Sequence, residues 1–192
     1  MTLSYADAAA QITAPGERYE THEITVNGVT YTAFKGAPGT LRELFDLTTL
    51  YGDTEYLVYE DERYTFTEVH AHAAGLAAAL VNRYGVRKGD RVAIAMRNYP
   101  EWIMTYVGAL AAGAIVVSMN AWWTAEELDY GLEDSGTTVL VADAERVART
   151  RESAARLGIR TIGVRLGDGD TPEGVDRWED VVEPGATYER PE

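Results

Sequence analysis

Short apolar strands alternate with helical segments along most of this chain, and this alternation restricts the fold more than any other feature. Apolar runs at 91–96, 114–119, 138–142 and 159–164 are separated by segments with helical periodicity. Parallel strands need crossovers of about this length, and such crossovers are nearly always right-handed. The sequence therefore predicts an α/β fold in which a mostly parallel sheet is covered by helices.

Capping signals place the starts of the helices. Thr65 with Glu68, and Thr124 with Glu127, have the spacing of a capping box, in which the two side chains satisfy each other's backbone amides. Asp143 follows an apolar strand directly and is an N-cap candidate. The predicted helices after the first of these strands are 100–113, 125–135 and 144–157; the helix that begins at Thr65 is predicted to reach about residue 84, and another covers 40–51.

The N-terminal part has a different pattern. Two β-rich runs at 22–26 and 29–34 flank Asn27-Gly28, whose residues accept the positive φ angles of a type I′ turn. We therefore predict N-terminal β-hairpins, the second at 56–66. After residue 166 an acidic, glycine-rich loop precedes a predicted helix at 175–182 and a tail without a visible core.

These patterns divide the chain into three parts. Residues 1–39 form an N-terminal segment with a β-hairpin, residues 40–166 an α/β subdomain, and residues 167–192 a loop, helix and tail.

Charge and composition exclude several classes of protein. The 192 residues carry 31 acidic and 17 basic side chains, a net charge of −14, which argues against binding to nucleic acid or to anionic membranes. The apolar run at 103–119 is split by Gly108 and Gly113, so we assign it to the core and not to a membrane span. The chain has no cysteine and no basic N-terminus, which is typical of a cytoplasmic protein.

The sequence offers little catalytic chemistry. It has no glycine-rich loop ending in Gly-Lys-Ser or Gly-Lys-Thr, and no Gly-x-Gly-x-x-Gly between a strand and a helix. His70 and His72 are two residues apart on a helix, point about 200° apart and cannot share a metal ion. We therefore predict no catalytic residue and no metal site within these residues, and take both histidines as surface or helix-face residues.

Two groups of residues are candidates for ligand contact. Trp122 and Trp123 follow a buried strand, and ligands of open parallel sheets bind at that end of the strands; the alternative is that they fill a gap between helix and sheet. Arg146 and Arg149 lie three residues apart on one helix face. They either pair with Glu145 and Glu152 in solvent or recognise phosphate.

Several blocks in a fixed order resemble the N-terminal subdomain of adenylate-forming enzymes, and most closely that of fatty acyl-CoA synthetases. The blocks cover roughly residues 40–165. They are residues 64–68 (YTFTE), 89–93 (GDRVA), 98–102 (NYPEW), 108–117 (GALAAGAIVV), 120–128 (NAWWTAEEL) and 132–136 (LEDSG). At Ala121 many such enzymes have proline instead, which leaves the subfamily open.

The resemblance implies an acid–thiol ligase that uses ATP, magnesium and CoA. In such enzymes a fatty or other carboxylic acid reacts with ATP to give an acyl-adenylate and pyrophosphate, and the CoA thiol then displaces AMP. The phosphate loop, the ribose-binding acid, the hinge and the catalytic lysine all come after the part that this chain resembles. The resemblance thus implies an inactive N-terminal fragment, with no cofactor bound by the fragment alone. It also implies that Asn120, Trp122 and Trp123 border the path taken by the pantetheine arm of CoA, here called the CoA path. Arg146 and Arg149 would then lie near the CoA phosphates.

Two alternatives remain at this stage. The chain could be a stand-alone, non-catalytic binding module whose exposed apolar surface supports a homo-oligomer. The parent enzyme could also be an aryl-CoA ligase or an amino-acid adenylating domain, since most residues lining an acyl pocket would lie elsewhere.

Overall fold

The computed structural model describes residues 3–191 and divides the chain into two compact units, Met1–Leu44 and Phe45–Glu192. In the first unit, α1 (Tyr5–Ile12) precedes an antiparallel hairpin of β1 (Thr21–Val26) and β2 (Val29–Phe34). Asn27 and Gly28 have φ angles of 51° and 81°, so the turn predicted from the Asn-Gly pair is confirmed. The helix α2 (Leu41–Leu47) begins after Thr40, whose hydroxyl accepts a hydrogen bond from the Glu43 amide at 3.1 Å.

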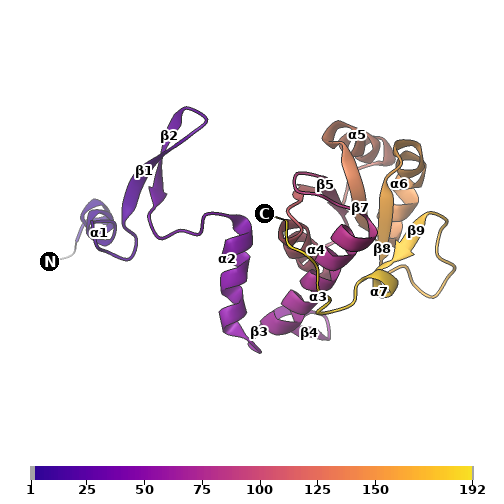
Figure 1. Ribbon diagram of the computed structural model, residues 1–192, viewed down its shortest axis with the longest axis horizontal. Coiled ribbons are helices and arrows are strands. Elements are labelled where there is room, and N and C mark those ends of the chain that lie inside the picture. The colour runs from indigo at the N-terminus through magenta and orange to yellow at the C-terminus, as the bar shows by residue number, and fades with distance from the viewer. Residues whose placement is uncertain (1–2, 192) are drawn as a thin grey trace. The chain divides into compact units, whose positions relative to one another are not determined.

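The second unit contains the predicted alternation of strands and helices (Figure 1). A short 3₁₀ turn (Thr48–Tyr51) leads into the hairpin of β3 (Glu55–Tyr59) and β4 (Glu62–Thr65). Its remaining elements in chain order are α3 (Phe66–Ala78), a π-helical turn (Ala79–Arg83), β5 (Arg91–Ala95), α4 (Pro100–Ala111), β6 (Ile115–Ser118), α5 (Ala125–Ser135), β7 (Thr137–Asp143), α6 (Ala144–Leu157), β8 (Arg160–Val164), β9 (Val175–Arg177) and α7 (Trp178–Val181).

Five of these strands form one parallel sheet in the order β6-β5-β7-β8-β9. The prediction of an α/β fold with a mostly parallel, helix-covered sheet and N-terminal hairpins is confirmed. Both capping boxes and the Asp143 N-cap are also present. The expected helix to residue 84 changes to π-helical geometry at Ala79, and Gly85 follows with a φ of 69°.

Alternate residues of the central strands face two separate cores, as period-two strand geometry requires. Val92 and Ile94 of β5 belong to a cluster with Leu80 of the π-helical turn and with residues of α3 and α4. Ala93 and Ala95 of the same strand belong to a cluster with α5 and α6. Figure 1 shows these two helix pairs on opposite faces of the sheet. Strands buried on both faces explain the continuous apolar runs in the sequence.

The prediction of one helix at 175–182 is wrong. Val175, Asp176 and Arg177 pair in parallel with β8 as the outer strand β9, and only Trp178–Val181 is helical. The free edge of β8 offers backbone hydrogen bonds that outweigh the weak local helix preference of so short a segment. Asp176 then accepts a hydrogen bond at 2.7 Å from the Tyr84 hydroxyl, which fixes the new strand to the end of the helical segment.

The C-terminal tail packs more closely than its composition predicts. The Gly185 amide donates to the Ala71 carbonyl at 2.8 Å, so the tail lies along α3. Arg190 makes a two-bond ion pair with Asp46 at 2.9 and 3.0 Å. Within residues 3–191, no helix has both the length and the apolar content needed to span a membrane.

Replacing Thr124 by alanine is expected to lower the free energy of unfolding by about 1 kcal/mol, because the N-cap of α5 loses its acceptor. The Thr124 hydroxyl accepts from the Glu127 amide at 3.2 Å, and the Glu127 carboxylate accepts from the Thr124 amide at 2.8 Å. Urea denaturation measures the change. Thr187→Ala, at an exposed tail residue, is the control and should have little effect; equal losses in both variants would contradict the capping role.

Candidate functional site

The sheet has a topological switch point between β5 and β7. The chain leaves β5 for α4 on one face of the sheet and leaves β7 for α6 on the other, although the two strands are neighbours. The first residues after these strands therefore separate and leave a crevice at their carboxyl ends. Ligands of open α/β sheets bind in crevices of this kind.

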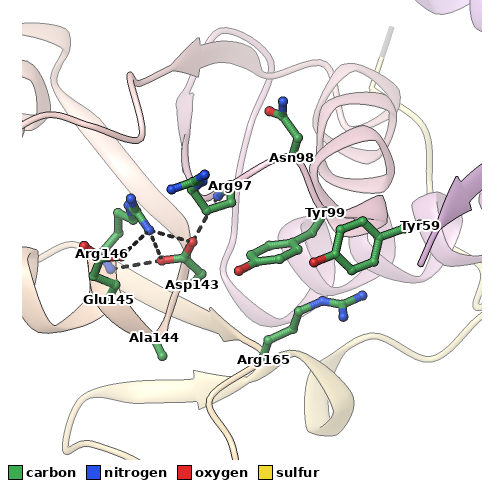
Figure 2. Close-up of a pocket in the computed structure, with 9 residues that line it drawn as sticks. All are labelled: Tyr59, Arg97, Asn98, Tyr99, Asp143, Ala144, Glu145, Arg146 and Arg165. Atoms are coloured by element: carbon green, nitrogen blue, oxygen red, sulfur yellow. Dashed lines mark hydrogen bonds and ion pairs between the residues drawn. The ribbon is translucent and has the colours of Figure 1, made fainter. Parts of the chain in front are cut away.

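A pocket of about 450 Å³ occupies this crevice. Its lining comes from the residues that follow three neighbouring strands and from one residue of the β3–β4 hairpin (Figure 2). The lining residues are Arg97, Asn98 and Tyr99 after β5, Asp143, Ala144, Glu145 and Arg146 at the end of β7 and start of α6, Arg165 after β8, and Tyr59 of β3.

Asp143 and Arg146 form a buried ion pair in the wall of this pocket. Their side chains are 5% and 2% exposed, and Arg146 Nη1 lies 3.1 Å from Asp143 Oδ2. Asp143 also accepts from the backbone amides of Arg146 and Arg97, each at 3.0 Å. One carboxylate therefore caps α6, neutralises a buried guanidinium and holds the segment that leaves β5.

Arg165 organises the opposite wall. Its guanidinium donates two hydrogen bonds to the Glu62 carboxylate at 2.8 and 2.9 Å, and another to Glu101 at 3.1 Å. It also lies over the rings of Tyr59 and Tyr99, 5.1 and 4.9 Å from their centroids. These contacts join the hairpin, the start of α4 and the end of β8, and they leave Arg165 with its charge matched by two carboxylates.

The same cluster perturbs two titratable groups. The hydrogen bond from Arg165 lowers the pKa of Glu62. Tyr64 donates to Glu62 at 2.9 Å, and burial, assisted by this hydrogen bond, raises the pKa of Tyr64 to about 12. Glu62 is therefore held ionised and Tyr64 neutral over the physiological pH range, as a structural cluster requires.

The candidate residues after β6 lie in a short loop, residues 120–123, at the same carboxyl edge. Asn120 is exposed and accepts the Trp122 amide on its Oδ1 at 2.9 Å. Trp122 is 71% exposed, and the Arg97 guanidinium lies over its ring, 4.1 Å from the centroid. Trp123 turns inward to the α5 side, where a Cβ on Gly131 would come within 3.0 Å of its ring. The two tryptophans thus have different surroundings, one facing solvent and one filling a gap.

Both candidate arginines of α6 reach this loop. Arg146 Nε donates to the Ala121 carbonyl at 2.8 Å, and its Nη2 donates to the same oxygen. Arg149 Nη1 donates to the Trp123 carbonyl at 2.8 Å. Glu145 accepts from both arginines. The structure therefore brings all five candidate residues together, with Arg146 buried and Arg149 about one-third exposed.

Sequence reasoning missed Arg97 and Arg165. A signal for Arg97 was present, since it comes two residues after the end of the buried strand β5. Arg165 carried the same signal, since it directly follows the buried strand β8, but its partners Glu62 and Glu101 are distant in sequence and could not be inferred.

The histidines are half-buried on α3. Burial lowers the pKa of both His70 and His72, and His70 Nε2 lies 2.8 Å from the Thr48 hydroxyl oxygen. Across residues 3–191, no group of three or more His, Cys, Asp or Glu side chains is arranged to hold a metal ion.

A family profile and individual known proteins both match this chain. The profile of the family described as AMP-binding enzyme matches residues 46–189. The chain is 38% identical over 103 residues to 4-coumarate–CoA ligase 3 of Oryza sativa subsp. japonica, covering 54% of this chain and 18% of that protein. It is 37% identical over 130 residues to a long-chain-fatty-acid–CoA ligase of Salmonella typhimurium, covering 67% of this chain and 23% of that protein.

Solved structures of ligases share the fold of this chain. A putative long-chain-fatty-acid CoA ligase from Rhodopseudomonas palustris superimposes with a TM-score of 0.68 at 27% identity, over 79% of this chain and 39% of that one. Coronafacic acid ligase from Pectobacterium brasiliense shares the fold, with a TM-score of 0.70 at 21% identity over 79% of this chain and 31% of that one. The part of this chain that matches the rice and Salmonella ligases spans about a fifth of the length of each of them. The family match covers most of the chain, and the chain accordingly belongs to the AMP-binding enzyme family.

Proposed function

We propose that this chain is the N-terminal part of an ATP-dependent acid–thiol ligase that makes acyl-CoA thioesters. The observation that carries the proposal is the match to the AMP-binding family over residues 46–189, together with relatives named as CoA ligases. In the proposed reaction a carboxylate oxygen attacks the α-phosphorus of ATP and pyrophosphate leaves. The CoA sulfur then attacks the acyl carbonyl and AMP leaves. Magnesium would neutralise the phosphate charge.

Within that enzyme, residues 40–166 are proposed to form the α/β subdomain, residues 1–39 a segment ahead of it, and residues 167–192 the connection to the catalytic part. The sequence contains neither type of glycine-rich phosphate loop, and the residues that match the relatives cover only 18% and 23% of their lengths. We therefore propose that the remainder of the protein supplies the groups that bind ATP and magnesium, and that residues 1–192 alone are inactive.

This proposal has a direct test. Residues 1–192 are incubated with ATP, magnesium, CoA and a panel of aliphatic and aromatic carboxylic acids, and pyrophosphate release is measured. No release above the buffer background is expected. Carboxylate-dependent turnover would show that the catalytic groups lie within these residues.

The 120–123 loop is the proposed border of the CoA path. Three features support this role: its position at the carboxyl edge of the sheet, the open face of Trp122, and the arginines of α6 beside it. Asn120, Trp122, Trp123, Arg146 and Arg149 are thus the proposed CoA-path residues. A long, flexible ligand such as pantetheine fits an exposed loop with an aromatic face better than a closed cavity.

Replacing Arg149 by alanine in the complete enzyme is expected to raise the KM for CoA about tenfold and to leave the KM for ATP unchanged. Arg149 is about one-third exposed and holds the Trp123 carbonyl, so the loop loses both a cation and an anchor. Steady-state kinetics with each substrate varied in turn measure the effect. Arg151, exposed on the same helix, gives the control variant Arg151→Ala; an unchanged KM for CoA in Arg149→Ala would contradict the assignment.

The acyl substrate is proposed to be a carboxylic acid of the fatty-acid class, with aromatic acids as the runner-up. Relatives of both kinds match the chain, one named for 4-coumarate and others for long-chain fatty acids. The complete enzyme with hexadecanoate and 4-coumarate in competition would distinguish the two classes.

One observation favours a second candidate function, a non-catalytic dimerisation module. In the hairpin of the first unit, Ile24 lies opposite Tyr31 and Val26 opposite Val29, so all four side chains share one face, and all are exposed. An isolated two-stranded hairpin is marginally stable, so such a face needs a cover. Light scattering on the 192-residue chain separates the candidates, since a dimer abolished by Ile24→Lys would favour the module.

A further inference from the structure

The three arginines of the switch-point pocket are not equivalent. Arg146 is almost completely buried, and its donors are taken by Asp143, Glu145 and the Ala121 carbonyl. Arg165 is held by Glu62 and Glu101. Binding a further anion at Arg146 would break a buried ion pair, which is costly. At Arg165 the positive charge is already matched by two carboxylates.

Arg97 is the exception. Its side chain is exposed and makes no ion pair with any carboxylate of residues 3–191, and its guanidinium lies over the ring of Trp122. A guanidinium that lies over an aromatic face keeps its N–H donors in its own plane, directed away from the ring. Arg97 therefore presents a planar, unoccupied set of donors at the pocket.

The surroundings of Arg97 favour an anion. Ala144 and Glu145 are the first residues of the fourteen-residue helix α6 and line the pocket, at a helix end where amides lack intrahelical acceptors. The nearest buried carboxylate, Asp143, is already neutralised by Arg146 and by two backbone amides. Arg146 and Arg165 are paired with carboxylates, so Arg97 is the lining arginine whose charge no carboxylate of residues 3–191 neutralises.

The loop that carries Trp122 is fixed in place. Arg146 and Arg149 hold the carbonyls on either side of Trp122, those of Ala121 and Trp123, and the Asn120 side chain holds the Trp122 amide. Trp122 is thus presented at a defined position although its ring is exposed, and Arg97 is oriented by it. This arrangement preorganises the cation, because the long arginine side chain does not have to be ordered when a ligand binds.

We propose that Arg97, oriented by Trp122, is the anion-binding residue of a phosphate site in the pocket between β5 and β7, and that the site takes a small organic phosphate. A guanidinium fork beside a helix N-terminus suits a phosphate group. The pocket volume of about 450 Å³ exceeds the needs of a bare ion and is in the range of small-molecule sites. The tyrosines 59 and 99 line the same pocket and offer aromatic surface to the organic part. The site does not depend on the ligase reaction proposed above.

Binding of phenyl phosphate to the 192-residue chain tests this site. Titration calorimetry at constant ionic strength gives the affinity, and the indole N–H resonance of Trp122, assigned with Trp122→Phe, reports the location. We expect saturable binding that shifts this resonance, with benzoate, the matched carboxylate, binding more weakly. Inorganic phosphate measures how much of the affinity comes from the phosphate group alone. Saturable phenyl phosphate binding that Arg97→Gln weakens supports the site.

The decisive variants are Arg97→Gln and a matched control, Arg87→Gln. Arg87 is also exposed but precedes β5, at the opposite edge of the sheet. Arg97→Gln is expected to weaken phenyl phosphate binding at least about tenfold, and Arg97→Lys to give an intermediate loss because lysine keeps the charge but not the planar fork. Arg87→Gln should bind as the unmodified chain does. The proposal is overturned by absence of saturable binding, by equal affinity in Arg97→Gln, or by benzoate binding as tightly as phenyl phosphate.

Discussion

Replacing Gly108 by alanine is expected to destabilise the protein by about 3 kcal/mol, at the upper end of the range for overpacked cores. Gly108 lies on α4 where this helix crosses α3. A Cβ there would lie 2.7 Å from the Ala73 carbonyl oxygen and 3.2 Å from two carbons of Leu76. Since the first of these atoms is helix backbone, the two helices must separate. The gain in helix propensity from Gly to Ala, about 1 kcal/mol, does not offset this.

Urea denaturation with matched glycine variants measures the effect. Gly169→Ala is the control, because no atom lies within 4 Å of a Cβ built on Gly169. Gly75→Ala is an intermediate case, since a Cβ there would meet the Glu183 backbone at 2.3 Å, but Glu183 belongs to the C-terminal tail, which can shift. The expected order of destabilisation is Gly108, then Gly75, then Gly169. Equal stability of Gly108→Ala and Gly169→Ala would contradict the close helix crossing.

Replacing Arg146 by methionine is expected to cost about 3 kcal/mol, because it leaves the buried Asp143 carboxylate without its cation. Two backbone amides still donate to Asp143, which places the expected loss at the lower end for broken buried ion pairs. The loop should also loosen, since the Ala121 carbonyl loses its donors. Denaturation gives the stability, and the indole N–H resonance of Trp122 reports the loop.

The control for this variant is Arg151→Met, which removes an exposed arginine from the same helix and should change the stability by less than about 0.5 kcal/mol. The double variant Asp143→Asn with Arg146→Met removes both charges and is expected to recover part of the loss. Equal stability of Arg146→Met and Arg151→Met would show that the pair between α6 and the sheet edge contributes nothing.

Local sequence signals were sufficient for most of the fold. The capping boxes at Thr65 and Thr124 and the Asn27-Gly28 turn are formed by neighbouring residues, so their patterns determine their geometry. The order of the strands in the sheet could not be predicted from such local signals. It depends on which edge each crossover returns to, and the short strand at Val175–Arg177 exists because the edge of β8 was available to it.

The candidate site was predictable only in part. The sequence placed Trp122 and Trp123 at the carboxyl edge of the sheet, since an apolar strand precedes them and a helix cap follows. That strand, β6, was expected to be buried but lies at the side of the sheet, with Ile115 exposed. It could not show that Arg146 is buried, because that depends on the loop that α6 packs against. The contacts of Arg165 with Glu62 join residues 103 positions apart, and long-range ion pairs of this kind leave no periodic signal in a sequence.

Within the proposed ligase, we assign ligand positioning to the sheet edge described above and bond making to another part of the protein. The five-stranded sheet fixes the ends of β5, β6 and β7, and the arginines of α6 hold the loop beside them. We propose that this edge guides a ligand and takes no part in bond making, because its buried charges are already paired. Bond making is proposed to belong to the remainder of the protein.

The most direct test of this account is carboxylate-dependent exchange of labelled pyrophosphate into ATP. The native protein that contains this chain is isolated from its source cells with an antibody against residues 45–191 and compared with residues 1–192 alone. We predict exchange by the native protein that requires magnesium and a carboxylic acid, and none by residues 1–192. Exchange by residues 1–192, or a native protein that shows none with any aliphatic or aromatic acid, would contradict the account.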